Sequence, residues 1–217
     1  MCARSARCPV SAALDGAVEL LDRSLAYTRV LLADVRPDNL GRPTPCVGWT
    51  LGHLLAHMED ALDAFTEAAA GRVEVERVPE TSTRVEALRE KACALLGAWT
   101  AARPASERVE VGDLGFDAPL LVATAALEIT VHGWDVGQAT GRRTRIPEDL
   151  AEGLLTVAQH VIDPADRGPR FACPRPTPPE AASDVRLLSW TGRAPAHMTE
   201  PLRSNSGEAT PRRGMAS

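Results

Sequence analysis

Apolar residues recur at intervals of three and four along most of this chain, the spacing that puts them on one face of an α-helix. The pattern predicts four long helices, at about residues 11–35, 51–70, 81–102 and 118–140. Two further helices are expected near the C-terminal end, at about 147–163 and 184–190. Residues 103–116 read as a loop, with a short alternation at 109–111 that fits a strand fragment. The fold class expected is all-α, a helical bundle with additional short C-terminal helices and extended segments.

Residue types that favour helix ends support these boundaries. Ser11, Thr50 and Asp117 are expected to cap the N-termini of the first, second and fourth helices. Pro147 is expected at the first position of the fifth helix, where its missing N–H costs nothing. Gly141 suits the left-handed conformation that often follows the last turn of a helix.

The helix expected at 118–140 is apolar almost all round, which indicates a central, buried helix. Glu128 and His132 lie four residues apart on it, so their side chains share one face, and Asp135 follows three residues later. A glutamate is seldom fully buried without a partner. An ionised Glu128 therefore predicts a cation beside it, either a metal ion held together with His132 or a buried ion pair with His132 itself.

A third ligand-type side chain comes from the second helix, where His57 points inward with Leu54 and Ala61. Two histidines and one carboxylate form the ligand set of many catalytic zinc sites. Fe²⁺, Ni²⁺ and Mn²⁺ also accept nitrogen and oxygen ligands. We expect His53, one turn earlier, to be partly exposed; the less favoured alternative is that His53 and His57 grip the metal together.

Other residues beside these motifs have simpler interpretations. Asp135 either bonds to a backbone group or an arginine, or it orients a ligand histidine. Cys46 precedes the second helix with no evident partner, so we expect a structural role. Trp49 and Trp134 are expected to fill gaps in the core.

Composition narrows the classes of function. The 217 residues suffice for one domain, expected at 11–195 between a flexible leader (1–10) and a disordered polar tail (196–217). A net charge of −5 gives no basic surface for nucleic acid. No apolar run approaches the roughly 20 residues of a membrane span. The five cysteines show no CxxC spacing and no signal peptide is evident, so a cytoplasmic protein without disulfides is expected, as a monomer or homodimer.

Two segments, PTPCVGWTLGHLLAHM and LEITVHGWDVGQATG, carry a family resemblance. They resemble the DinB-like metal-binding superfamily, and within it the branch of the mycothiol-dependent maleylpyruvate isomerase N-terminal domain. The resemblance covers roughly residues 11–195. It implies a four-helix bundle that binds a divalent metal, usually zinc, through His57, Glu128 and His132.

The resemblance and the ligand set together suggest an enzyme. We expect a metal-dependent S-transferase or isomerase that joins a low-molecular-weight thiol, such as mycothiol, to a small electrophilic substrate. One alternative is a small hydrolase that uses metal-bound water. The other is a non-catalytic metal-binding or stress-response module, which a fourth protein ligand such as His53 would favour.

Overall fold

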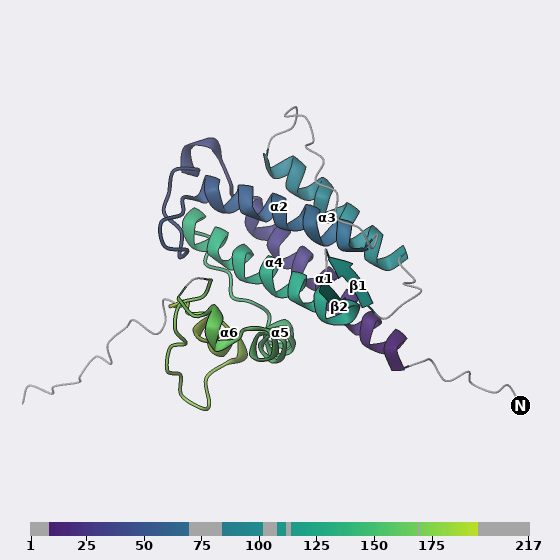
Figure 1. Ribbon diagram of the computed structural model, residues 1–217. Coiled ribbons are helices and arrows are strands. Elements are labelled where there is room, and N and C mark those ends of the chain that lie inside the picture. Colours follow the sequence, from purple (N-terminus) through teal and green to yellow (C-terminus); the bar gives the residue numbers. More distant parts are fainter. Residues whose placement is uncertain (1–8, 70–83, 102–107, 112–113, 169, 195–217) are drawn as a thin grey trace, which may run out of the picture.

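The computed structural model describes residues 9–69, 84–101, 108–111, 114–168 and 170–194, and these form a helical bundle (Figure 1). The four long helices are α1 (Pro9–Leu32), α2 (Leu51–Ala69), α3 (Arg84–Ala101) and α4 (Ala118–Thr140). Two shorter helices, α5 (Glu148–Val161) and α6 (Ser183–Trp190), pack on each other, and α5 contacts α1 and α4. The predicted all-α class is confirmed.

Several predicted boundaries shift. Helix α1 begins at Pro9 and ends at Leu32, so Ser11 lies inside the helix and does not cap it. Thr50 does cap α2, because its side-chain oxygen accepts the backbone N–H of His53 at 3.3 Å. Pro147 is the N-cap of α5 and not its first helical residue. Most of the expected leader (1–8) and the whole expected tail (196–217) lie outside the described residues.

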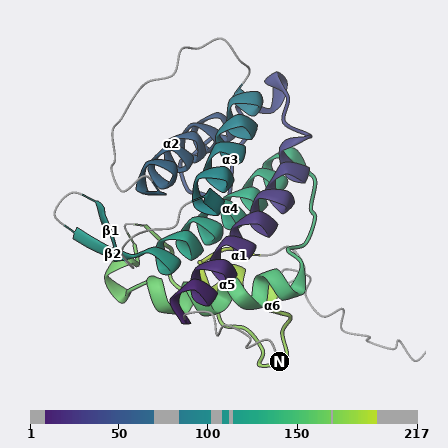
Figure 2. The ribbon, with the colours of Figure 1, turned by 90° about the vertical axis from the view of Figure 1, so that its right-hand side faces the viewer.

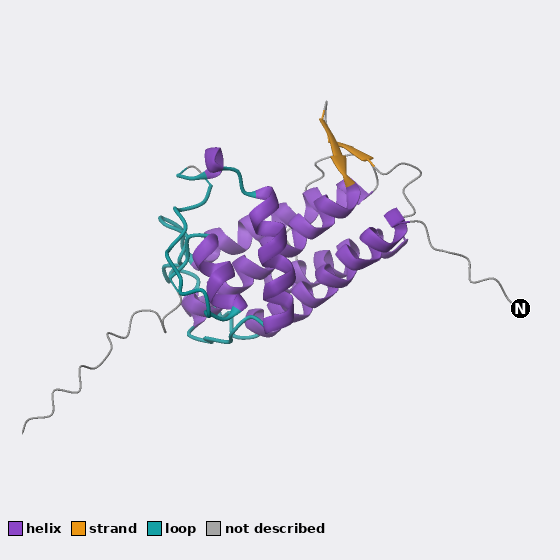
Figure 3. Ribbon diagram, turned by 90° about the horizontal axis from the view of Figure 1, so that it is seen from below, coloured by secondary structure: helices purple, strands orange, loops and turns teal. Residues whose placement is uncertain are grey.

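The expected strand fragment is one half of a hairpin. Strands β1 (Arg108–Val111) and β2 (Leu114–Asp117) pair antiparallel, with Val109 opposite Phe116. Figure 3 shows this hairpin at one end of the long helices and most of the loops at the other end. The loop end contains the short 3-10 helices η1 (Pro37–Asn39) and η2 (Pro164–Asp166), together with the segments around them.

Helix α4 is the centre of the bundle. Of its 23 residues 16 are buried, as the apolar pattern predicts, and α1 packs along its length (Figure 2). It ends at Gly141, which has a φ of 92° and therefore adopts the left-handed conformation. None of the helices in the described part of the chain is long and apolar enough to cross a membrane.

The close approach of α1 and α4 depends on Gly133. A Cβ atom at Gly133 would overlap the Oγ1 of Thr28 and lie 3.1 Å from the Cβ of Thr28. Thr28 cannot turn away freely, because its hydroxyl is buried and donates to the carbonyl of Ile129 at 2.9 Å. The two helices can therefore pack at this distance only with glycine at position 133.

We expect Gly133→Ala to lower the free energy of unfolding by about 1–3 kcal/mol, the usual cost of forcing extra volume into a packed core. The matched control is Gly97→Ala on α3, where a Cβ would meet nothing within 4 Å. That change should stabilise the protein by up to about 1 kcal/mol through helix propensity. Urea denaturation of both variants measures the difference. Equal effects at the two positions would contradict this account of the α1–α4 contact.

Candidate metal centre

Helices α2 and α4 bring together the three predicted ligand side chains. His57 from α2 and Glu128 and His132 from α4 each offer one ligand atom, and these atoms lie within 4.8 Å of one another. The Nε2 of His132 is 3.3 Å from a carboxylate oxygen of Glu128. The rings of His57 and His132 meet edge to face, with centroids 5.1 Å apart. The structure thus gathers the three residues around one point between the helices.

His53 takes no part in this group. It lies in the first turn of α2 and is exposed, as expected for the less central of the two histidines. The group of nearby ligand atoms that contains His57 does not include His53. The alternative in which His53 and His57 grip a metal together is therefore not favoured by the geometry.

The second nitrogen of His132 faces Asp135. Its Nδ1 lies 3.1 Å from the Oδ2 of Asp135, whose side chain is completely buried. Asp135 also receives the Arg193 guanidinium, with Nη2 2.8 Å from the same oxygen. Asp135 thus makes both of the contacts considered for it, one with an arginine and one with a histidine. An ionised carboxylate can only accept, so Nδ1 is the donor and Nε2 is left to face Glu128.

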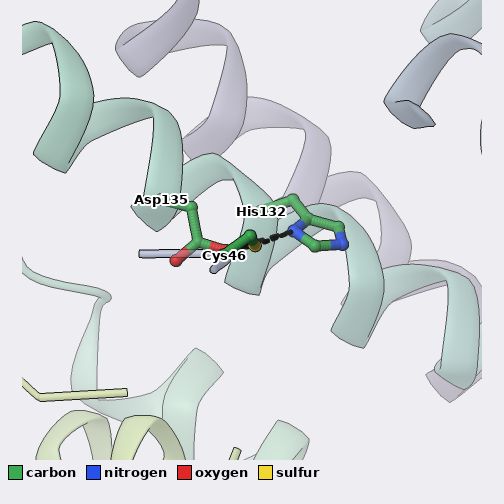
Figure 4. Close-up of side chains that lie close together, drawn as sticks. All are labelled: Cys46, His132 and Asp135. Atoms are coloured by element: carbon green, nitrogen blue, oxygen red, sulfur yellow. Dashed lines mark hydrogen bonds and ion pairs between the residues drawn. The ribbon is translucent and has the colours of Figure 1, made fainter. Parts of the chain in front are cut away.

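Cys46 has partners that the sequence does not reveal. Its thiol donates to the Oδ2 of Asp135 at 3.3 Å, and its sulfur lies 3.9 Å from the Nδ1 of His132. Arg193 completes the group, with Nη2 3.6 Å from the sulfur. Figure 4 shows Cys46 and His132 turned toward each other beside Asp135. The sequence shows no partner for Cys46, whereas the structure surrounds its thiol with three polar side chains; the structural role expected of it stays a prediction.

Cys46, His132 and Asp135 form a second group of nearby ligand atoms that shares His132 with the first. Arg193 was not singled out by its sequence position, since it follows α6 and lies 58 residues from Asp135. The sequence gives little indication that Arg193 lies near Asp135, because the two residues are not separated by a spacing typical of a helix or a strand. Through its ion pair with Asp135, Arg193 brings the segment after α6 into contact with the candidate site.

Burial and charge act together on the pKa values here. Burial lowers the pKa of His132, but its hydrogen bonds with Asp135, Cys46 and Glu128 prevail and raise this pKa well above its ordinary value. Burial would raise the pKa of Glu128, yet His132, His57 and Arg193 lower it. The pKa of His57 is lowered by burial and by the charge of His132. The two carboxylates in this part of the bundle, Glu128 and Asp135, thus each have a positive partner in the structure, His132 and Arg193 respectively.

A cavity of about 630 Å³ opens beside the three ligand side chains, and we call it the loop-side cavity. The loop before α2 and helices α2 and α4 line it, together with seven residues that follow α5: Gly168, Arg170, Phe171, Ala172, Thr191, Gly192 and Arg193. Trp49 forms part of this wall, with its ring centroid 5.0 Å from that of His57. Trp49 is 37% exposed, so the expectation that it fills the core is wrong, whereas Trp134 is buried as expected.

Comparison with known proteins agrees with the motifs. The family model described as the mycothiol maleylpyruvate isomerase N-terminal domain matches residues 21–137. Two Mycobacterium tuberculosis proteins are 28% identical to the chain over 165 residues, which is 75% of this chain and 90% of each relative. They are the uncharacterized proteins MT0763 of strain CDC 1551 / Oshkosh and Rv0738 of strain ATCC 25618 / H37Rv. No solved structure matches the chain significantly. The family match spans more than half of the sequence and includes α2 and most of α4, so the chain belongs to the mycothiol maleylpyruvate isomerase N-terminal domain family.

Proposed function

We propose that this protein binds one divalent metal ion, preferentially zinc, through His57, Glu128 and His132. We further propose that it uses the metal to transfer a low-molecular-weight thiol to a small electrophile, or to isomerise such a molecule with the thiol as co-substrate. The observation that carries the proposal is the convergence of the three side chains within 4.8 Å beside a large cavity. Mycothiol is the thiol that the family description suggests.

The donor set fits a zinc ion. Two imidazoles and one carboxylate match the three-ligand sites that leave a further position for water or substrate. A ligand histidine commonly donates its other ring N–H to a carboxylate, which holds the ring in place. Asp135 is in that position toward His132, at 3.1 Å from Nδ1. This argument favours His57, Glu128 and His132 over the group with Cys46, in which Asp135 would be a ligand itself.

A zinc ion held by His57, Glu128 and His132 would lower the pKa of a thiol that binds it, and so would make a thiolate nucleophile available at neutral pH. The protein's own residues have other tasks. Asp135 keeps the Nδ1 proton of His132 in place, and Arg193 balances the charge of Asp135. Trp49 and Phe65 give the loop-side cavity an apolar wall, while Arg170 and Arg193 contribute positive groups to the same cavity. Such a cavity suits a thiol that carries both polar and apolar parts.

The non-catalytic alternative has less support. A closed metal site needs a fourth protein ligand, and His53, the residue considered for that position, is exposed and outside the group. A cavity of about 630 Å³ also lies directly against the ligand side chains, which favours access for a small molecule. The hydrolase alternative differs from the proposal in one property, since it would need no thiol.

The test is a conjugation assay with the zinc-loaded protein and monochlorobimane, a small electrophile that becomes fluorescent when a thiol adds to it. We expect the rate to rise above background with mycothiol present and to fall to background after a chelator removes the metal. Glutathione and cysteine serve as comparison thiols, and His53→Ala should behave as the wild type. Ester hydrolysis without any thiol would support the hydrolase instead. Failure to take up metal after reconstitution would refute the proposal.

A further inference from the structure

A second cavity approaches the same side chains from within the bundle. It has a volume of about 370 Å³ and lies among α1, α2, α3 and α4, and we call it the inner cavity. Glu128 and His132 line both the inner cavity and the loop-side cavity, as does Ala61 between them. The candidate metal centre therefore stands between two spaces, one on either side.

The wall of the inner cavity is almost entirely hydrocarbon. All four long helices contribute apolar side chains, among them Leu25, Met58, Leu88, Leu96 and Ile129. Charged residues on its lining other than Glu128 are Asp22, Arg29 and Arg89, and all three are exposed. Two are arginines and one is an aspartate, so this exposed part of the lining has a small excess of positive charge, and the preference for a neutral molecule must come from the apolar wall behind it. Glu128 and His132 are the ionisable groups at its inner end.

We propose that the inner cavity binds the substrate of this protein, and that the substrate is a neutral, mainly hydrocarbon small molecule. Its apolar part packs against the leucines, and its one polar group reaches Glu128 and His132. This inference rests on the proposed function and adds to it a class of substrate and a separate entrance. The thiol occupies the loop-side cavity, so the two reactants meet at the metal centre from different sides.

The chemistry of the wall explains the preference for a neutral molecule. Apolar surface moved out of water gains about 25 cal/mol per Å². The leucine-rich part of the wall offers no hydrogen-bond donor to a carboxylate, so an acid would lose hydration there that a neutral molecule does not need. Small organic acids are therefore poor occupants of this cavity.

Met58 provides a local probe for the test. Its side chain is 5% exposed and lines the inner cavity, and it is absent from the lining of the loop-side cavity. The protein is labelled with ¹³C-methyl methionine and titrated with benzyl alcohol and cyclohexylmethanol. Benzoate and cyclohexanecarboxylate are the charged counterparts of the same size. We expect the neutral probes to shift the Met58 methyl resonance to saturation, and the carboxylates to bind at least tenfold more weakly.

Matched substitutions locate the binding. Ala92→Phe places a ring in the inner cavity, and Ala64→Phe places one in the loop-side cavity. The first change should abolish the Met58 shift and the second should preserve it, with thermal denaturation confirming that both variants fold. No saturable shift in the wild type, equal binding of alcohol and carboxylate, or loss of the shift only in Ala64→Phe would overturn the proposal.

The same titration of His57→Ala separates this inference from the proposed function. His57 does not line the inner cavity, so the variant should lose metal and still bind the neutral probes as the wild type does. If metal and thiol transfer are confirmed but the probes do not bind, the inference fails alone. If the probes bind but the wild type takes up no metal, the proposed function fails, and the inner cavity remains a binding site for apolar molecules.

Discussion

His132→Ala is expected to abolish metal binding. The purified wild type should contain about one equivalent of zinc after reconstitution and dialysis, and the variant almost none. The substitution removes a proposed ligand nitrogen, and with it the contacts of His132 with Glu128 through Nε2 and with Asp135 through Nδ1. The fall in affinity should exceed the roughly 10–100-fold that follows loss of an outer partner of a ligand. Elemental mass spectrometry gives the metal content, and competition with a chromogenic chelator gives the affinity.

Two further variants decide which group of residues holds the metal. His57→Ala removes a ligand of the proposed set, whereas Cys46→Ser removes a ligand of the second group, and His132 belongs to both. The proposal expects metal to be lost with His57→Ala and retained with Cys46→Ser. The reverse result would place the metal beside Asp135 and contradict the proposed ligands. His53→Ala is the histidine control, because this side chain is exposed on α2.

Arg193→Met is expected to lower the free energy of unfolding by about 3–5 kcal/mol, the range seen when one partner of a buried ion pair is removed. Asp135 is completely buried and keeps its charge beside Arg193, whose own side chain is 10% exposed. Methionine fills much of the same space but leaves the carboxylate without its cation. Urea denaturation measures the loss. Arg186→Met on α6 is the control. That arginine is exposed, so its substitution should change the free energy of unfolding by less than about 0.5 kcal/mol.

The destabilisation by Arg193→Met should depend on pH. In the wild type burial raises the pKa of Asp135, but Arg193 and His132 prevail and bring this pKa below its ordinary value of 3.8. The ion pair therefore contributes stability above the unfolded-state pKa, and that contribution disappears as the pH falls through the folded-state pKa. The difference between the variant and the wild type should be greatest at neutral pH and should shrink in acid. A destabilisation below about 1 kcal/mol at neutral pH would show that Asp135 does not need this arginine.

His132 and Arg193 contribute to the candidate site in different ways. His132 belongs to the proposed metal ligands, whereas Arg193 acts through Asp135 and brings the C-terminal segment against α4. Arg193→Met should therefore affect stability first, and metal affinity through the orientation of His132. A variant that keeps its stability but loses metal would assign Arg193 a direct role in the centre.

Local periodicity in the sequence was enough to determine α4 and its polar face. Glu128, His132 and Asp135 lie on one side of a buried helix because residues three and four apart coincide on any α-helix. The same reasoning placed His57 on the inward side of α2 and His53 outside. These statements needed no knowledge of the rest of the chain, because they depend on backbone geometry and on the preference of apolar residues for the core.

Only the tertiary structure determines which side chains from the rest of the chain contact this polar face of α4. Cys46 and Arg193 lie in connections outside the helices, 89 and 58 residues from Asp135, and no periodic pattern tells where a loop will bring its side chains. Trp49 has a large apolar side chain of the kind usually found in a core, but it lies in a loop that places it beside His57 at the surface. The inner cavity likewise depends on how far four separate helices lie from one another. That spacing is set by close contacts between distant residues, such as Gly133 with Thr28, which a sequence pattern does not contain.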